Sequence, residues 1–318
     1  MQGFLRRLAV RLLPPVVTDA LRVLLARARA ARPVSVPAPS KGPSEPSVAE
    51  PLPPAPPLPP PPPPSPTEPP EWEIVADTDE VWASLRGWDD RSVAATQIEK
   101  WPDFKAGLTG PGMLGQSHEA TTARLDLATH NTIVSFGYAL ARAGAGKERM
   151  SILDWGGGIG HYFLYARALL PDVALDYTVK DLPTLCREGR LLLPEVAFVA
   201  DDSVLASTYD FVFASSSVHY ERDPYAALTR LAAASRHWLF VTRAPILSGG
   251  DDLLVVQRPY AYGYMTEYAG WLMNRERLVA CLEQSGFALE RQFLIGEQPY
   301  LPMLEEPPQY YGFLFRRT

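Results

Sequence analysis

The stretch from Ser151 to Gly160, which reads SILDWGGGIG, constrains the fold of this 318-residue chain more than any other feature. A short apolar run ends at a cluster of glycines, and a helical pattern from Tyr162 to Leu170 follows at once. A strand that enters a glycine-rich turn and then a helix directs backbone N–H groups and the helix N-terminus toward a ligand. The stretch therefore predicts an α/β domain with a ligand site at this turn.

Strands and helices alternate through the C-terminal half. Apolar runs predict strands over residues 151–154, 175–179, 196–199, 210–214 and 238–242, and helical spacing predicts helices over 121–143, 162–170, 182–192, 225–235 and 275–285. Such alternation is typical of βαβ units around a mostly parallel sheet. Two last strands, over 287–295 and 310–315, flank a proline-broken segment, which favours an antiparallel pair. We therefore expect a Rossmann-like α/β fold with a seven-stranded, mostly parallel sheet and an antiparallel C-terminal pair.

The register of the glycines separates two kinds of nucleotide site. The dinucleotide fingerprint needs glycines at relative positions one, three and six, and no starting glycine from 156 to 158 satisfies it. An acid at the strand end followed by alternating glycines does fit, and this pattern resembles the first motif of class I S-adenosylmethionine-dependent methyltransferases. The resemblance implies that the loop backbone passes under the methionine part of S-adenosylmethionine, where a Cβ would fill the space of the ligand. The loop residues implied to bind the cofactor are Asp154, Gly156, Gly157, Gly158 and Gly160.

The same resemblance implies further cofactor contacts at the strand ends. Asp181 ends the second strand, where a carboxylate can accept both ribose hydroxyls. Asp201 and Asp202 end the third strand, where this class often contacts the adenine amino group. His161 opens the helix after the loop, close to the expected methionine carboxylate, and Ser215 ends the fourth strand. An Asp after a strand is also a common cap or turn residue, so no single acid decides the matter.

The chain also resembles a narrower bacterial family of methyltransferases, often encoded beside polysaccharide-assembly genes. The shared segments are Leu13–Pro15, Gly87–Asp89, Leu153–Tyr162, Ser215–Tyr220 and Thr242–Pro245, with Gln257 and Asn274. The resemblance implies O-methylation of a glycan or glycan precursor. A small metabolite, a protein side chain, or a non-catalytic cofactor-binding scaffold stay open as alternatives. That family is expected to carry Glu at the ribose position, whereas here Lys180 precedes Asp181, so which side chain reaches the ribose also stays open.

Two neighbouring residues after the fourth strand are candidates for the chemistry. His219 could act as the general base for a hydroxyl acceptor, and Tyr220 competes with it for contact with the substrate. The alternative for His219 is a hydrogen-bonded structural histidine. No metal is expected, because no Cys or His follows the His219–Glu221 pair at ligand spacing.

An aromatic segment from Pro259 to Trp271, read as a loop leading to a helix, could form a wall of the acceptor site. Aromatic faces suit sugar rings and attract a sulfonium through cation–π interaction. Ordinary packing of the tyrosines is the competing interpretation.

Composition divides the chain into unlike regions. Residues 1–32 carry seven Arg and one Asp, and residues 33–70 hold 19 of the 33 prolines with a net charge of −2. Since the whole chain sums to −6, the remainder carries −10. An acidic globular part is a poor partner for a phosphate backbone, so a nucleic-acid substrate is not expected. The chain has two cysteines, Cys186 and Cys281. We expect both to be small, buried hydrophobic residues in a reducing compartment.

These observations predict four regions. Residues 1–32 read as two basic amphipathic helices that could lie on an anionic membrane interface, although a solvated tail, a docked helical cap or a transit peptide are alternatives. Residues 33–70 read as a disordered, proline-rich linker, residues 71–146 as a helical extension, and residues 147–318 as the S-adenosylmethionine-binding domain. We expect a cytoplasmic protein, with the inner face of the membrane as one location, and an oligomeric state that the sequence leaves open.

Overall fold

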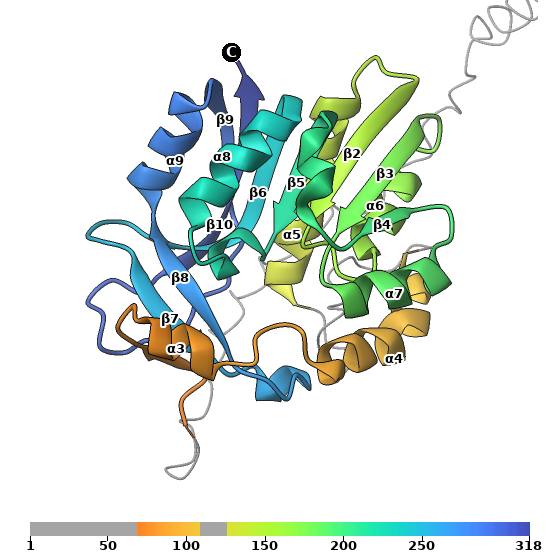
Figure 1. Cartoon of the computed structure of the whole chain (residues 1–318). Coiled ribbons are helices and arrows are strands. Elements are labelled where there is room, and N and C mark those ends of the chain that lie inside the picture. The colour runs from red at the N-terminus through yellow and green to blue at the C-terminus, as the bar shows by residue number, and fades with distance from the viewer. Residues whose placement is uncertain (1–68, 109–125) are drawn as a thin grey trace, which may run out of the picture. The chain divides into compact units, whose positions relative to one another are not determined.

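The computed structural model describes residues 69–108 and 126–318. Ten strands of these residues form a sheet with a parallel centre: β2 (Arg149–Trp155), β3 (Ala174–Lys180), β4 (Ala197–Val199), β5 (Tyr209–Ser215) and β6 (Ser235–Leu247). Their order is β4-β3-β2-β5-β6, so the chain starts in the middle at β2 and winds first to one side and then to the other (Figure 1). Such a reversal opens a crevice outside the carboxyl ends of the neighbouring strands β2 and β5.

The C-terminal strands form the predicted antiparallel pair. Strand β10 (Gln309–Arg317) lies between β6 and β9 (Phe287–Leu294) and runs antiparallel to both. All seven predicted strands are found, and the expected α/β, Rossmann-like fold with a mostly parallel sheet is confirmed.

The sheet continues beyond the seven expected strands. The additional strands are β1 (Trp72–Ile74), β7 (Leu253–Gln257) and β8 (Tyr268–Asn274). They pair with one another in antiparallel fashion, and β8 joins the end of β6 through Ile246 and Leu247.

The aromatic segment from Pro259 to Trp271 does not lead into a helix, so that expectation was wrong. It passes through a 3₁₀ turn, η3 (Tyr260–Tyr262), and then enters β8. Six of the seven residues of β8 are buried. A strand buried on both faces lacks the alternation of polar and apolar residues that marks a strand in a sequence.

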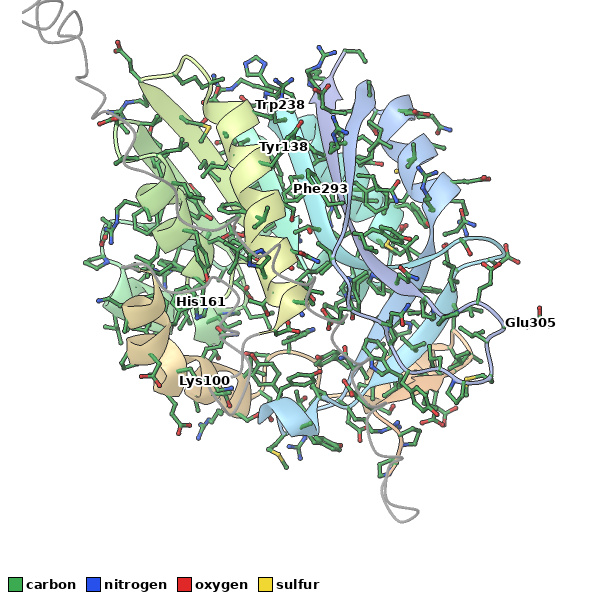
Figure 2. The ribbon with its side chains drawn as sticks, turned by 180° about the vertical axis from the view of Figure 1, so that it is seen from behind. Lys100, Tyr138, His161, Trp238, Phe293 and Glu305 are labelled. Carbon is green, nitrogen blue, oxygen red and sulfur yellow. The ribbon has the colours of Figure 1, made fainter. Side chains whose placement is uncertain are left out.

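Helices cover both faces of the sheet. One face carries α5 (Leu127–Gly144), α6 (His161–Leu169) and α7 (Pro183–Leu192), and the other carries α8 (Pro224–Ala234) and α9 (Arg275–Gln284). Alternate strand residues supply the two cores, since Ile152 packs into the first and Leu153 into the second. Figure 2 shows α5 lying along the sheet, with Tyr138 beside Phe293 of β9 at a ring separation of 5.4 Å.

The region before β2 differs from the expected helical extension. It contains β1 as well as α3 (Asp79–Ser84) and α4 (Arg91–Gly107), and α5 is one of the layers of the fold because it contacts β5, β6 and β10. Helix α5 begins after Asp126, which caps it, so the predicted start at residue 121 lies outside the described residues. The predicted basic helices of residues 1–32 and the predicted linker up to residue 68 lie outside the described residues too. No helix of the described residues is long and apolar enough to cross a membrane.

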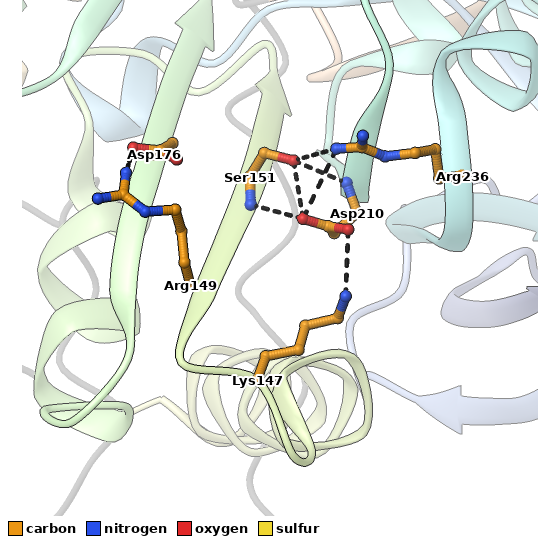
Figure 3. A network of polar contacts seen from close by, with 6 residues as sticks. All are labelled: Lys147, Arg149, Ser151, Asp176, Asp210 and Arg236. Atoms are coloured by element: carbon orange, nitrogen blue, oxygen red, sulfur yellow. Dashed lines mark hydrogen bonds and ion pairs between the residues drawn. The ribbon is translucent and has the colours of Figure 1, made fainter.

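A polar network at the amino ends of β2 and β5 fixes the register of the two central strands (Figure 3). The Asp210 carboxylate accepts hydrogen bonds from the backbone N–H and the hydroxyl of Ser151, both at 2.9 Å, and from Lys147 at 3.1 Å. Arg236 donates to the Ser151 hydroxyl at 2.8 Å. Burial raises the pKa of Asp210, but the bonds from Ser151 and Lys147 outweigh it and hold that pKa below its usual range.

Asp210→Ala is expected to lower the free energy of unfolding by about 1–3 kcal/mol, because it leaves the N–H of Ser151 and the Lys147 ammonium without their acceptor. Asp176→Ala is the matched control, since the Asp176–Arg149 ion pair is exposed on both sides and should contribute less than about 1 kcal/mol. Urea unfolding of the two variants measures the difference. Equal midpoints would show that the network does not stabilise the sheet.

Candidate functional site

A cavity of about 400 Å³ lies at the carboxyl ends of β2, β3 and β5. Its volume falls within the range of roughly 300–1,000 Å³ that is common for small-molecule sites. The glycine loop, the neighbouring strand ends and the segment between α3 and α4 form its walls. Lining residues include Trp82, Trp88, Gln97, Gly156, Gly157, Gly158, His161, Lys180, Asp181, Ser215, Tyr220, Glu221, Arg243 and Tyr268.

The loop after β2 has no room for side chains. A Cβ on Gly156 would lie 2.3 Å from the Cβ of Ser217, and the φ of +73° at Gly156 also disfavours any other residue. A Cβ on Gly157 would lie 2.5 Å from the carboxylate of Asp154. The bare backbone of the loop therefore forms the cavity wall, as a close approach to a ligand requires.

Asp154 supports the loop from below and does not line the cavity, which corrects its expected role as a ligand contact. Its side chain is fully buried, and one oxygen accepts a hydrogen bond from Tyr177 at 2.8 Å. Its other oxygen has no partner among the described residues. Burial, reinforced by the nearby Asp181, raises the pKa of Asp154 to about 7, although the Tyr177 bond lowers it.

Asp181 lies at the edge of the cavity, directly against the loop. One carboxylate oxygen accepts from the N–H of Gly158 at 2.6 Å, and the other accepts from the N–H of Leu182 at 2.7 Å. Burial raises its pKa above the usual range despite these two bonds. The Lys180 ammonium instead sits 4.0 Å from the centre of the Trp155 ring and 3.3 Å from Asp202. Of Lys180 and Asp181, Asp181 is therefore the residue whose side chain bonds to the glycine loop.

Asp201 and Asp202 are not among the cavity-lining residues, in contrast to their expected contact with adenine. Asp201 caps the 3₁₀ turn η1 (Asp202–Ala206) by accepting from the N–H of Ser203 at 2.9 Å. Asp202 forms ion pairs with Lys180 and Arg230. Both carboxylates therefore act in local structure, which is the common role of Asp after a strand.

Three further expected cofactor residues have different positions. His161 lines the cavity, although it is only 3% exposed and packs edge-to-face on Trp101 and Phe104. Ser215 lines it too, and its hydroxyl shares a 2.9 Å hydrogen bond with Tyr162. Gly160 lies outside the lining, where it starts α6 and packs closely against Leu193.

Backbone strain is concentrated beside the cavity. Ser216 and Arg243, each with a φ of 49°, are the non-glycine residues with positive φ in the described part of the chain, and both line the cavity. Ser216 follows β5 and its N–H donates to the carbonyl of Thr242 at 3.0 Å. Arg243 lies in a β-bulge, where two residues of β6 oppose Gly312 of β10. The bulge re-aims a side chain of β6, and the Arg243 guanidinium donates to Glu297 at 3.0 Å.

His219 and Tyr220 are neighbours in the 3₁₀ turn η2 (Val218–Tyr220) but have different surroundings. Tyr220 lines the cavity and donates to the side chain of Gln257 at 3.2 Å. His219 is 1% exposed, is absent from the lining, and has no hydrogen-bond partner for Nε2 among the described residues. Burial, with a smaller effect of Arg243, lowers its pKa to about 3. The structure therefore contradicts the prediction that His219 is the general base.

Aromatic side chains form a further part of the cavity lining. Trp88 stacks on Tyr268 with ring centres 4.2 Å apart, and Tyr220 meets Trp88 edge-on at 5.0 Å. The N–H of Gly87 donates to the carbonyl of Glu267, and the Thr266 hydroxyl donates to the carbonyl of Gly87, so this segment is held against the loop before β8. Of the aromatic segment from Pro259 to Trp271, the residues that line the cavity are Tyr268 and Ala269, at the start of β8.

Several lining residues escaped sequence reasoning. Trp88 and Arg243 lie in segments that support the family resemblance, but no role was predicted for either residue. No sequence pattern predicted that Trp82, Gln97 or Glu221 would line the site. Gln97 does leave a signal, since it is a polar residue among the apolar positions of α4.

Asp154→Asn is expected to change how stability depends on pH. Because the folded pKa of Asp154 is about 7 and the unfolded value is near 3.8, the wild type loses stability as pH rises from 4 to 7, where the unfolded chain ionises first. Asn keeps an acceptor for Tyr177 but does not ionise. Over that pH range the free energy of unfolding of the variant should therefore rise by about 2–4 kcal/mol relative to that of the wild type. Urea unfolding at pH 5 and pH 7.5 measures it, with the exposed Asp172→Asn as control. Parallel pH profiles would contradict the buried-carboxylate assignment.

No protein-family model and no curated protein matches the chain. Similar solved structures include a 1,6-didemethyltoxoflavin-N1-methyltransferase of Burkholderia thailandensis with bound S-adenosylhomocysteine, at 16% identity and a TM-score of 0.42, covering 77% of this chain and 93% of that one. An S-adenosylmethionine-dependent methyltransferase of Clostridium acetobutylicum is 10% identical, with a TM-score of 0.40 and coverage of 57% and 89%. The cyclase SpnF is 13% identical, with a TM-score of 0.44 and coverage of 70% and 92%.

Proposed function

We propose that this chain is an S-adenosylmethionine-dependent methyltransferase. The observation that carries the proposal is the bare backbone of Gly156–Gly158, which walls a nucleotide-sized cavity at the switch point of the sheet. A loop that excludes every side chain on both of its sides is suited to a ligand that lies directly on the backbone.

The residues around the loop fit this cofactor. The loop would carry the methionine part, Asp181 the ribose hydroxyls, and His161 and Ser215 would border the methionine end. Asp181 has both oxygens on backbone N–H groups, and each oxygen retains a second lone pair for a hydroxyl. For the adenine ring we propose the apolar wall of Leu182 and Leu185 in place of Asp201 and Asp202.

When bound, S-adenosylmethionine supplies a methyl group on a sulfonium, which an acceptor atom attacks in line. The chain contributes position, exclusion of water and removal of a proton. Tyr220 is the group that we assign to hold the acceptor hydroxyl, because it lines the cavity and its own hydroxyl is oriented by Gln257. The Glu221 carboxylate, which also lines the cavity, is the proposed proton acceptor. His219 stays neutral and buried at physiological pH and takes no part.

We further propose that the acceptor is a hydroxyl of a glycan or glycan precursor. The support is the aromatic part of the cavity lining, which is formed by Trp82, Trp88, Tyr220 and Tyr268, since aromatic side chains are suited to contact with sugar rings. A small metabolite or protein acceptor would use the same faces. A cofactor-binding scaffold would retain the binding of the cofactor without turnover.

The location is a separate proposal. Seven Arg and one Asp in residues 1–32 suit contact with an anionic membrane, which would keep a cytoplasmic enzyme at the inner face. Flotation of the full chain with anionic vesicles tests it, and equal recovery of a chain that lacks residues 1–32 would sink it.

The full chain should bind S-adenosylmethionine in isothermal titration calorimetry. Gly158→Val should abolish the heat, because the residue has a φ of +59° and a side chain would enter the cavity wall beside Gln97. Gly249→Ala is the control, since nothing lies within 4 Å of its added Cβ. Retained affinity in Gly158→Val would refute the assigned loop, and no heat from the wild type at millimolar ligand would refute the cofactor.

Turnover separates the enzyme from the scaffold. With a labelled methyl donor, wild type should label a glycolipid fraction. Glu221→Gln should reduce kcat by about 10²-fold or more, because it removes the proposed proton acceptor, and Tyr220→Phe should reduce turnover too, because it removes the hydroxyl that holds the acceptor. Cofactor affinity should stay unchanged in both, and the exposed His237→Gln should keep wild-type turnover. Label that enters only cytosolic small molecules would contradict the glycan proposal and indicate a small-metabolite acceptor. A wild type that binds without any labelling would favour the scaffold.

A further inference from the structure

We propose that Gln97 of α4 binds the α-ammonium group of the methionine part of the cofactor. The proposal rests on the proposed function and assigns a contact from outside the glycine loop and the strand ends. It would make the helix before the central sheet part of the cofactor site.

Gln97 is a buried polar side chain with an unused acceptor. It is 7% exposed, and its Oε1 is fully buried with no hydrogen-bond partner among the residues that the structure describes. The side chain lines the cavity, and a Cβ on Gly158 would lie 3.0 Å from its Oε1. The carbonyl oxygen is therefore held against the loop at the cavity wall.

The packing of α4 gives no reason for a polar residue at this position. The other buried residues of the helix are Val93, Ala94, Trp101 and Phe104. They recur with Gln97 at helical spacing, so Gln97 stands in the middle of an apolar stripe. A buried acceptor without a partner destabilises the folded protein, and an apolar residue of similar size would avoid that cost. A ligand that donates to Oε1 removes that cost.

The chemistry of the cavity indicates which donor fits. The N–H groups of Gly156 and Gly158 already donate to the Lys180 carbonyl and to Asp181, and an N–H group cannot accept a hydrogen bond from the ammonium. Asp181 is available for the ribose, and Leu182 and Leu185 present apolar surface. Asp154 is sealed beneath the loop. The ammonium belongs to the methionine part that the loop would carry, so its acceptor must lie near the loop, and the Oε1 of Gln97 satisfies that condition.

The test compares two ligands that differ in the methionine part. S-adenosylhomocysteine carries the ammonium group, and 5′-methylthioadenosine lacks it but keeps adenine and ribose. Calorimetry on the full chain should give a loss of about 10- to 100-fold in affinity for S-adenosylhomocysteine in Gln97→Leu, as for a hydrogen bond to a charged group. Affinity for 5′-methylthioadenosine should stay as in wild type. The exposed Glu99→Gln, on the same helix, should leave both affinities unchanged.

Two further measurements separate the loss of a ligand contact from a general effect on the fold. Gln97→Leu without ligand should melt at the wild-type temperature or above it, because the unpartnered acceptor is gone. Gln97→Glu keeps acceptor oxygens and should keep most of the affinity for S-adenosylhomocysteine. Equal losses for both ligands, no loss for S-adenosylhomocysteine, or a loss in Gln97→Glu as large as in Gln97→Leu would overturn the proposal. A wild type that binds neither ligand would instead overturn the proposed cofactor.

Discussion

The site depends on one steric constraint, which is the close packing of the glycine loop between Asp154 and Ser217. Within three residues of β2 the backbone runs between the carboxylate of Asp154 on one side and Ser217 on the other, and neither leaves space for a Cβ. The Ser217 hydroxyl donates to the carbonyl of Trp155, and Asp181 accepts the N–H of Gly158. The loop is thus held in shape by its own surroundings, so that a ligand meets a preformed surface and loses less affinity to ordering.

The central fold was predictable because each core strand is a short apolar run between turn residues. Strand β3 was expected over 175–179 and spans Ala174–Lys180, and α7 and α9 end within one residue of their predictions. The strands outside the core were missed for physical reasons. Strand β1 has three residues, which are too few for an alternation to stand out, and β8 is buried almost throughout, so it shows no alternation. Aromatic residues at β8 were read as a helix because packing, which chose the strand, is not visible in local spacing.

The candidate site divides in the same way. Asp181, whose spacing from the loop reflects one βαβ unit, lines the cavity, whereas Asp201 looked equivalent but is exposed and caps its own turn. His219 and Tyr220 could not be ranked from the sequence, since adjacent residues of one 3₁₀ turn face a closed interior and the cavity respectively. Gln97 reaches the loop from a helix that precedes it by about sixty residues. No local pattern encodes such a contact.

The cavity lining comes from two different parts of the chain, and the strained residues lie where those parts meet. The glycine loop and the strand ends belong to the parallel core, and the aromatic residues Trp88 and Tyr268 belong to the segment before α4 and to β8. Ser216 leaves the core strand β5, while Arg243 lies at the bulge from which β6 continues toward β8. A positive φ at a non-glycine residue costs on the order of 1 kcal/mol or more and persists only where the surroundings impose it. Because the N–H of Ser216 bonds to the carbonyl that precedes Arg243, the two strained residues support each other.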